Sequence, residues 1–317
     1  MTPRERLFAA LRGEPTDRVP IWLLFPYHPA AYYVDVRNHP KYQPVVAAAE
    51  RQAITLNRRN PSVPLFGPEV RTGPGWLEYR GKRLGGDGGK LLRTEADLEL
   101  YCSLPVLADR GDIEACLDGW LAGYLREREE FPEQLGAMML DAGEPIGPLY
   151  HASDLTEYPV WSITHPDMVE DFLDRVMQRL RIVYQYCLER DLADVYFLVG
   201  SELASPPMVS PRTFDRWIVP YATELIEMIH RAGNLAIQHY HGQIREILSR
   251  FVEMGADGLH TIEAPPVGNC TLDEAFKTTG GKITLIGNIQ YDEFRSLKPE
   301  QMAERVRKVL DEAAGRR

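Results

Sequence analysis

The sequence has few cysteines and no long apolar run, and these absences exclude several classes of protein. Its four cysteines stand at positions 102, 116, 187 and 270, and none belongs to a C-x-x-C motif. A disulfide scaffold is therefore excluded, and a reducing cytoplasm is the expected compartment. Charged residues interrupt the N-terminal segment, and no apolar stretch approaches about 18 residues, so neither a secretory signal nor a membrane span is expected.

The chain also lacks an excess of positive charge. It has 36 Lys and Arg against 46 Asp and Glu, a formal net charge of -10. Such a surface repels phosphate backbones and anionic lipids, so neither nucleic acid nor a membrane is an expected partner. With 317 residues, of which 44% are hydrophobic and 26% charged, the composition is that of a globular protein with a sizeable core.

Short apolar runs alternate with helical segments along most of the chain. The long segment from about Pro166 to Arg190 carries apolar residues at spacings of three and four, which predicts a helix. Another helix is predicted from about Tyr42 to Leu56. Strands are predicted near residues 19, 62, 135, 193, 234, 257 and 283. This alternation predicts an α/β fold with a parallel sheet that is covered on both faces.

Polar residues follow these strands at the points where they end, which favours a (β/α)8 TIM barrel over an open sheet. The groups in question are Asp141, Gly200-Ser201-Glu202, His239-Tyr240-His241, Glu263 and Asn288. Residues 1–317 are predicted to form one barrel domain. Residues from about 60 to 110 are rich in proline and glycine and predict a hairpin excursion from it.

The segment His239-Tyr240-His241 is the strongest candidate for a metal site. In an extended segment both histidines point to the same side, and Glu263 ends the next predicted strand. Two histidines and one carboxylate form an open zinc set that leaves a position for substrate. Alternatively, one histidine packs in the core and the other caps a helix near Gly242. His260 is expected to be a core histidine.

Three carboxylates in strand-following loops are candidates for acid–base chemistry or substrate positioning. Asp141 and Glu202 are predicted to be catalytic, and Glu144 is predicted to bind substrate. The alternative is that these residues belong to solvated loops. The other residues predicted to bind substrate are Phe25, Tyr27, His28, Tyr240 and Asn288. Cys270 is expected to be a small buried residue rather than a thiolate.

Several segments resemble the uroporphyrinogen decarboxylase superfamily over nearly the whole chain. They are Thr2 to Pro15 with Asp17-Arg18-Val19-Pro20, the segment His239 to Gly242, Gly255-Ala256-Asp257 and Gly287-Asn288-Ile289. The resemblance implies a (β/α)8 barrel with its site at the carboxyl ends of the strands. The superfamily includes the tetrapyrrole decarboxylase and zinc-dependent methyltransferases that exchange methyl groups with corrinoid proteins or thiols.

Departures from these patterns favour the methyltransferases. The decarboxylase carries an arginine-containing segment after its first strand and an aspartate after its second. This chain has Phe25-Pro26-Tyr27-His28-Pro29 and Val63-Pro64-Leu65-Phe66-Gly67 there. The methyltransferases place His-x-Cys after the fifth strand, where this chain has His239 and His241. Glu263 falls where the related cobalamin-independent methionine synthase places a glutamate ligand. The resemblance thus implies a zinc or other divalent metal site at His239, His241 and Glu263.

Replacing a thiolate ligand with neutral imidazole makes a bound ion a stronger Lewis acid. We therefore predict a metal-dependent methyltransferase or O-demethylase that moves a methyl group between a small, for example methoxylated, compound and a corrinoid protein or thiol. Alternatives are a metal-free tetrapyrrole decarboxylase and a non-catalytic binder of a tetrapyrrole or corrinoid. The expected partners are the small-molecule methyl donor, a corrinoid protein and a second copy in a homodimer. The resemblance also implies an eighth strand, beyond Arg317.

Overall fold

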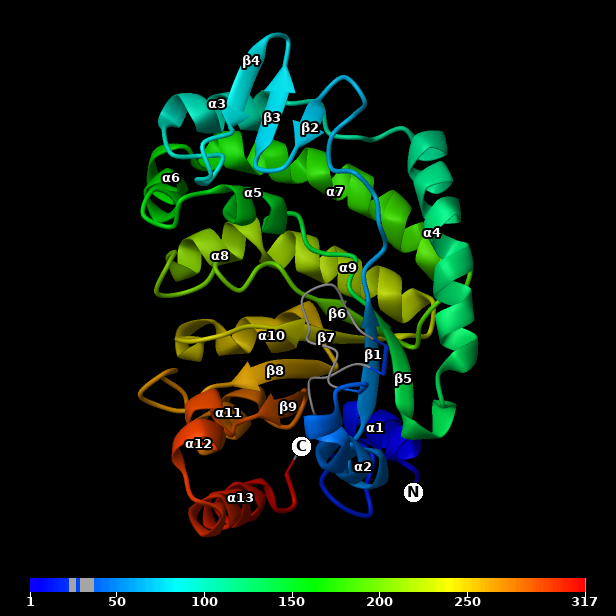
Figure 1. The fold of residues 1–317 in the computed structure, drawn as a ribbon. Helices are drawn as coiled ribbons and strands as arrows, with labels where there is room; N and C mark the ends of the chain where they lie inside the picture. Colours follow the sequence, from blue (N-terminus) through cyan, green and yellow to red (C-terminus); the bar gives the residue numbers. More distant parts are fainter. Residues whose placement is uncertain (23–26, 29–36, 317) are drawn as a thin grey trace.

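The computed structural model describes residues 1–22, 27–28 and 37–316. Within them a six-stranded parallel sheet, in the order β1-β5-β6-β7-β8-β9, curves into a half-barrel (Figure 1). Its strands are β1 (Thr55–Arg59), β5 (Gly136–Leu140), β6 (Val195–Leu198), β7 (Leu235–His239), β8 (Gly258–Ile262) and β9 (Thr284–Gly287). This arrangement confirms the predicted α/β fold of the barrel type.

Helices cover the outer face of the half-barrel (Figure 1). The long ones are α4 (Arg110–Glu130), α7 (Pro166–Glu189) and α9 (Val219–Arg231), followed by the shorter α10 (Leu248–Met254) and α11 (Leu272–Thr279). The apolar face of α7 buries Phe172, Val176, Leu180, Val183 and Cys187 against the sheet, as its periodicity predicts. This layer between the helices and the sheet is the larger of two apolar clusters.

The smaller apolar cluster fills the inside of the half-barrel and includes α1 (Pro3–Leu11). Thr2 and Glu5 form the capping box that starts this helix. Leu7 and Leu11 pack with residues that point inward from the strands, such as Met139, at the amino ends of the strands. The interior is therefore packed at one end, and the polar strand ends lie at the other.

The second strand lies earlier in the chain than we predicted. The helix predicted from Tyr42 to Leu56 ends sooner, as α2 (Gln43–Gln52), and β1 follows directly. The run 63–67, predicted as a strand, is a connection in which Phe66 forms only an isolated bridge to Val106. The prediction was wrong because β1 is polar: Asn57, Arg58 and Arg59 are buried there with polar partners, which an apolar pattern cannot reveal.

The predicted first strand is described only in part. Trp22 forms a parallel bridge with Ile54, next to β1, and the amide of Ile54 donates to the carbonyl oxygen of Ile21. Residues 23–26, which hold the rest of that run and Phe25, lie outside the described residues.

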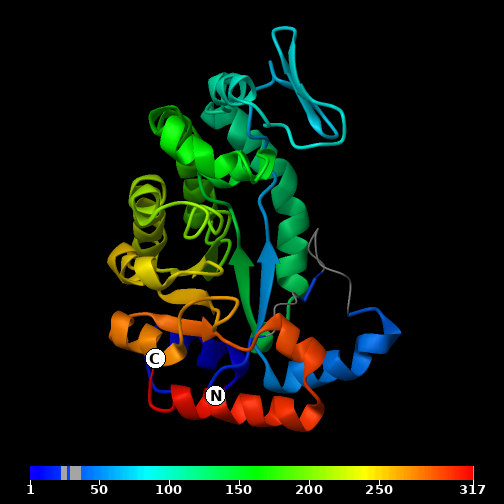
Figure 2. The same ribbon diagram turned by 90° about the vertical axis from the view of Figure 1, so that its left-hand side faces the viewer.

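A small antiparallel sheet stands between β1 and α3 (Glu95–Ser103) in the chain. It consists of β2 (Arg71–Gly73), β3 (Trp76–Tyr79) and β4 (Lys82–Gly85), and it projects from the helical layer (Figure 2). The other helices are α5 (Gly147–Ala152), α6 (Tyr158–Thr164), α8 (Pro211–Trp217), α12 (Tyr291–Ser296) and α13 (Pro299–Ala313), with 3-10 turns at Pro40–Tyr42, Glu133–Leu135 and Arg245–Ile247. No helix in the described parts of the chain has the length and apolarity needed to cross a membrane.

Candidate active site

A cavity of about 710 Å³ opens where β1, β5, β6 and β7 end. This volume is typical of small-molecule sites. Its polar lining consists of Arg58, Asn60, Asp141, Glu144, Tyr150, His151, Arg179, Glu202 and His239. The strand-end residues Asp141, Glu202 and His239, from three different strands, therefore face one space, as the barrel prediction requires.

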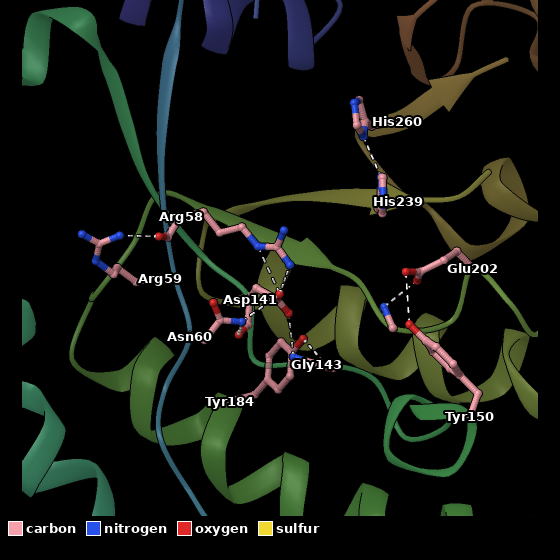
Figure 3. A network of polar contacts seen from close by, with 11 residues as sticks. Arg58, Arg59, Asn60, Asp141, Gly143, Tyr150, Tyr184, Glu202, His239 and His260 are labelled. Carbon is pink, nitrogen blue, oxygen red and sulfur yellow. Dashed lines mark hydrogen bonds and ion pairs between the residues drawn. The ribbon is translucent and has the colours of Figure 1, made fainter. Parts of the chain in front are cut away.

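Asp141 is held firmly at the end of β5 (Figure 3). The Arg58 guanidinium forms a buried ion pair with its Oδ2, at 3.2 Å from Nε. Asn60 Nδ2 donates to the same oxygen at 2.9 Å, and the amide of Gly143 donates to Oδ1 at 3.0 Å. Burial raises the pKa of Asp141, while Arg58 opposes the rise. Because protein donors occupy both oxygens, Asp141 chiefly orients Arg58 and the loop that follows β5.

Glu202 lies across the cavity from this pair, in the loop after β6 (Figure 3). Its Oε1 accepts a hydrogen bond from the Tyr150 hydroxyl at 3.2 Å, and its Oε2 accepts one from the amide of Gly200 at 2.9 Å. These two donors fix the carboxylate and leave it half-buried at the cavity wall.

Glu144 is the most deeply buried carboxyl group of the cavity, with an exposed fraction of 3%. Burial raises its pKa to about 8, the neighbouring Glu202 and Asp141 add to the rise, and the Ser201 hydroxyl opposes it. Its Oε2 has no hydrogen-bond partner within the described residues. Glu144 is therefore a neutral carboxylic acid at pH 7 and has a proton to donate.

His239, the last residue of β7, faces His260, which lies in the middle of the neighbouring strand β8. They are register partners of β7 and β8, their rings stack with centroids 4.8 Å apart, and their Nδ1 atoms are 2.7 Å apart (Figure 3). Burial lowers the pKa of His260 to about 3 and that of His239 even further, so both rings are neutral. One Nδ1 must then donate to the other, so His260 is a buried histidine whose hydrogen-bond partner is the predicted ligand His239.

His241 and Glu263 form a second pair beside the first. His241 Nδ1 lies 3.2 Å from Glu263 Oε1, and Glu263 Oε2 accepts a hydrogen bond from the amide of Gly242 at 2.7 Å. The rings of His239 and His241 are 4.5 Å apart, centroid to centroid. The four side chains are thus adjacent, but they contact each other in two pairs, His239 with His260 and His241 with Glu263. Among the described residues, no three or more His, Cys, Asp or Glu side chains are arranged to hold a metal ion.

Four other residues predicted to bind substrate lie in the described part of the chain and do not line the cavity. Tyr240 is fully buried between Phe214 and Phe251. Asn288 is buried after β9, where its carbonyl oxygen accepts a hydrogen bond from Arg305 of α13 at 3.0 Å. Arg305 Nη2 also lies 3.5 Å from Asn288 Oδ1. The side chains of Tyr240 and Asn288 therefore contact the surrounding helices.

Tyr27 and His28 lie against the end of α4. The Tyr27 ring packs edge-to-face on Phe131, and His28 Nε2 lies 3.2 Å from a carboxylate oxygen of Glu130. Phe25 falls outside the described residues. Of the five residues predicted to bind substrate that the structure describes, Glu144 is the one that lines the cavity.

Several residues of the cavity were not among those predicted from the sequence. Arg58 and Asn60 were not recognised because the second strand was predicted too late in the chain. In the structure both residues lie at the carboxyl end of β1. Arg179 lies within α7, where a charged residue reads as solvent-facing, yet it is buried. No local pattern distinguishes it from the exposed charges of the same helix. Cys270, by contrast, is buried as expected, and burial raises its pKa to about 11, so it remains a thiol.

Most of the chain is similar to two methyltransferases. The "Methylcobamide:CoM methyltransferase MtaA" of Methanosarcina barkeri is 24% identical over 300 residues, which cover 91% of this chain and 82% of that protein. The protein of the same name from Methanosarcina barkeri (strain Fusaro / DSM 804) is 25% identical over the same coverage.

Two further comparisons concern the fold and the family. The solved structure of a methyltransferase from Methanosarcina mazei has a TM-score of 0.54 at 18% identity and covers 91% of this chain and 83% of that one. It supports the barrel fold. The model of the uroporphyrinogen decarboxylase (URO-D) family matches residues 148–317, more than half of the chain. The protein therefore belongs to the uroporphyrinogen decarboxylase family.

Proposed function

We propose that the protein is a methyltransferase that moves a methyl group from a small methylated compound, such as a methoxylated one, to a corrinoid protein or a thiol. Similarity to two methyltransferases over 91% of the chain supports the reaction type. The observation that carries the proposal is the neutral acid Glu144 in a cavity that also presents His239. Cleavage of a methyl–oxygen bond needs such an acid, because the departing oxygen must be protonated.

The proposed reaction balances with one proton. The bond between the methyl carbon and the oxygen breaks, the oxygen keeps the electron pair, and the reduced corrinoid or thiolate forms the new bond to carbon. Glu144 donates the proton that converts the departing oxygen to a hydroxyl group. We assign Glu202, which lines the same cavity, as the group that takes up a proton from solvent and relays it to Glu144 after each turnover. Asp141 positions Arg58 and the loop that carries Glu144.

We further propose that His239, His241 and Glu263 hold a divalent metal ion such as Zn²⁺. Neutral imidazoles and a carboxylate are the donor types that zinc takes. His239 already contacts His260 through Nδ1, which leaves its Nε2 as the ligand atom and gives His260 the orienting role usual for the partner of a ligand histidine. His241 and Glu263 would exchange their mutual contact for ligation. The bound ion would supply Lewis acidity toward the substrate oxygen.

The metal proposal is tested by elemental analysis of the purified protein and of His239→Ala and His241→Ala. We expect one divalent ion per chain in the wild type and its loss from both variants. The exposed His39, on the turn before α2, provides the matched control as His39→Ala. A wild-type protein without stoichiometric metal after growth and refolding with zinc would refute this part of the proposal.

The methyl-transfer proposal is tested with cob(I)alamin and a panel of methoxylated compounds, following the absorbance change to methylcob(III)alamin. Glu144→Gln should lower kcat by roughly 10²-fold or more, the usual contribution of a general acid. Consumption of uroporphyrinogen with release of CO₂ would favour the decarboxylase instead. If no methylated acceptor forms with any donor, or if Glu144→Gln keeps full activity, the proposed mechanism is wrong.

A further inference from the structure

Arg179 is a buried guanidinium in the cavity wall that no carboxylate of the described residues neutralises. It belongs to α7, has an exposed fraction of 9%, and lines the cavity. Its Nε donates to the carbonyl oxygen of Pro64 at 2.9 Å and its Nη2 to that of Val63 at 2.6 Å. Within the described residues Nη1 makes no hydrogen bond, and no Asp or Glu lies within ion-pair distance. The side chain thus brings a positive charge and a free donor to this wall.

The two arginines that line the cavity, Arg58 and Arg179, differ in whether a carboxylate neutralises them. Arg58 is neutralised by Asp141, so that pair brings no net charge to the cavity. Among the described residues the partners of Arg179 are carbonyl oxygens. Although burial lowers the pKa of Arg179 to about 10, it stays a cation at pH 7. Buried charges are normally paired, because an uncompensated charge in a low-dielectric site is costly. The missing partner must therefore come from whatever fills the cavity.

The rest of the wall indicates what kind of molecule would bring that partner. Val176, Leu180 and Phe197 give it an apolar surface, and the volume of about 710 Å³ suits a small organic molecule. An apolar body with one anionic group fits this combination. Arginine is well suited to such a group, since its planar fork binds carboxylate and related oxyanions with two hydrogen bonds.

We propose that Arg179 binds the carboxylate or sulfonate group of a small organic anion, so that the cavity selects anionic over neutral substrates. This inference deepens the proposed function, on which it rests for the identity of that anion as the methyl donor or the thiol acceptor. Arg179 then fixes one end of the substrate, while Glu144 and His239 face the rest of the cavity.

The test compares matched anionic and neutral probes by isothermal titration calorimetry. The pairs are 4-methoxybenzoate with 4-methoxybenzamide, and 2-mercaptoethanesulfonate with 2-mercaptoethanol. For at least one pair we expect the wild type to bind the anion about tenfold or more tightly than the neutral probe, the range for a charge-assisted hydrogen bond. Arg179→Met should abolish this preference, and Arg179→Lys should keep part of it.

A control arginine lies on the same helix. Arg181 is paired with Glu224 outside the cavity, so Arg181→Met should leave the preference unchanged. If Arg179 serves only to tie residues 63–64 to α7, Arg179→Met will weaken both members of a pair equally, and the proposal fails. It also fails if wild-type protein binds neither anion at millimolar concentration. Because binding is measured without turnover, an anion preference without methyl transfer would refute the proposed function and leave this inference standing.

Discussion

Replacing Glu144 with glutamine should stabilise the protein increasingly as the pH rises. Glu144 is buried and no cation of the described residues neutralises it, and its pKa is about 8 in the folded protein against an ordinary value of 4.5. Glutamine has nearly the same shape and cannot ionise. The two proteins should therefore differ little in acid, where Glu144 is protonated in both the folded and the unfolded state.

The size of the effect follows from the two pKa values. Between pH 4.5 and about 8 the unfolded chain ionises Glu144 and the folded chain does not, so the free energy of unfolding of the wild type falls as the pH rises. Each pH unit in this window is worth about 1.4 kcal/mol. From pH 5.5 to 7.5, Glu144→Gln should gain roughly 3 kcal/mol relative to the wild type, and the gain should level off above pH 8.

The assay is urea unfolding, followed by circular dichroism, of both proteins at half-unit steps from pH 5 to 8.5. Glu227→Gln, at an exposed position on α9, is the matched control and should track the wild type at every pH. If the curves for wild type and Glu144→Gln stay parallel across this range, Glu144 ionises normally in the folded protein. It would then be no neutral acid at pH 7, and the proposed proton donor would be lost.

Three further changes test other parts of the structure. Arg58→Met leaves Asp141 buried without its cation and should lower the free energy of unfolding by roughly 3–5 kcal/mol in urea titrations; a loss below about 1 kcal/mol would contradict the buried pair. Gly136→Ala would place a Cβ atom 1.9 Å from the carbonyl oxygen of Thr55, so thermal unfolding should show a large drop in Tm, and an unchanged Tm would show that β1 and β5 pair differently. Removing metal with a chelator should abolish methyl transfer and zinc should restore it, whereas full activity of the chelated enzyme would exclude a catalytic ion beside His239.

Much of the fold was predictable because it depends on local patterns. The capping residues Thr2 and Glu5 predicted the start of α1, and the apolar periodicity from Pro166 onward predicted α7. The position of β1 was not predictable in this way. Its residues Asn57 to Arg59 are polar, and they are buried only because partners from β5, α4 and the segment around His28 reach them. Hydropathy describes single segments and carries no information about such partners.

The candidate site also has one part that the sequence predicts and another that it does not. The placement of Asp141, Glu202 and His239 after strands was enough to predict that they meet, because the carboxyl ends of parallel strands share one end of a barrel. The protonation states and hydrogen-bond partners of the site residues were not predictable. The neutral form of Glu144 comes from burial among residues distant in the sequence, and the pairing of His239 with His260 comes from the register of β7 against β8.

The sequence by itself determined that this chain has few cysteines, no membrane-spanning run, an acidic surface and alternating strands and helices that place polar residues at strand ends. These are properties of composition and local order, which need no knowledge of distant contacts. Only the tertiary structure decided that Glu144 is a buried neutral acid and that Arg179, within an amphipathic helix, is a cation in the same cavity without a carboxylate partner among the described residues. The reason is physical: desolvation and charge pairing depend on which distant groups surround a side chain, and folding alone brings those groups together.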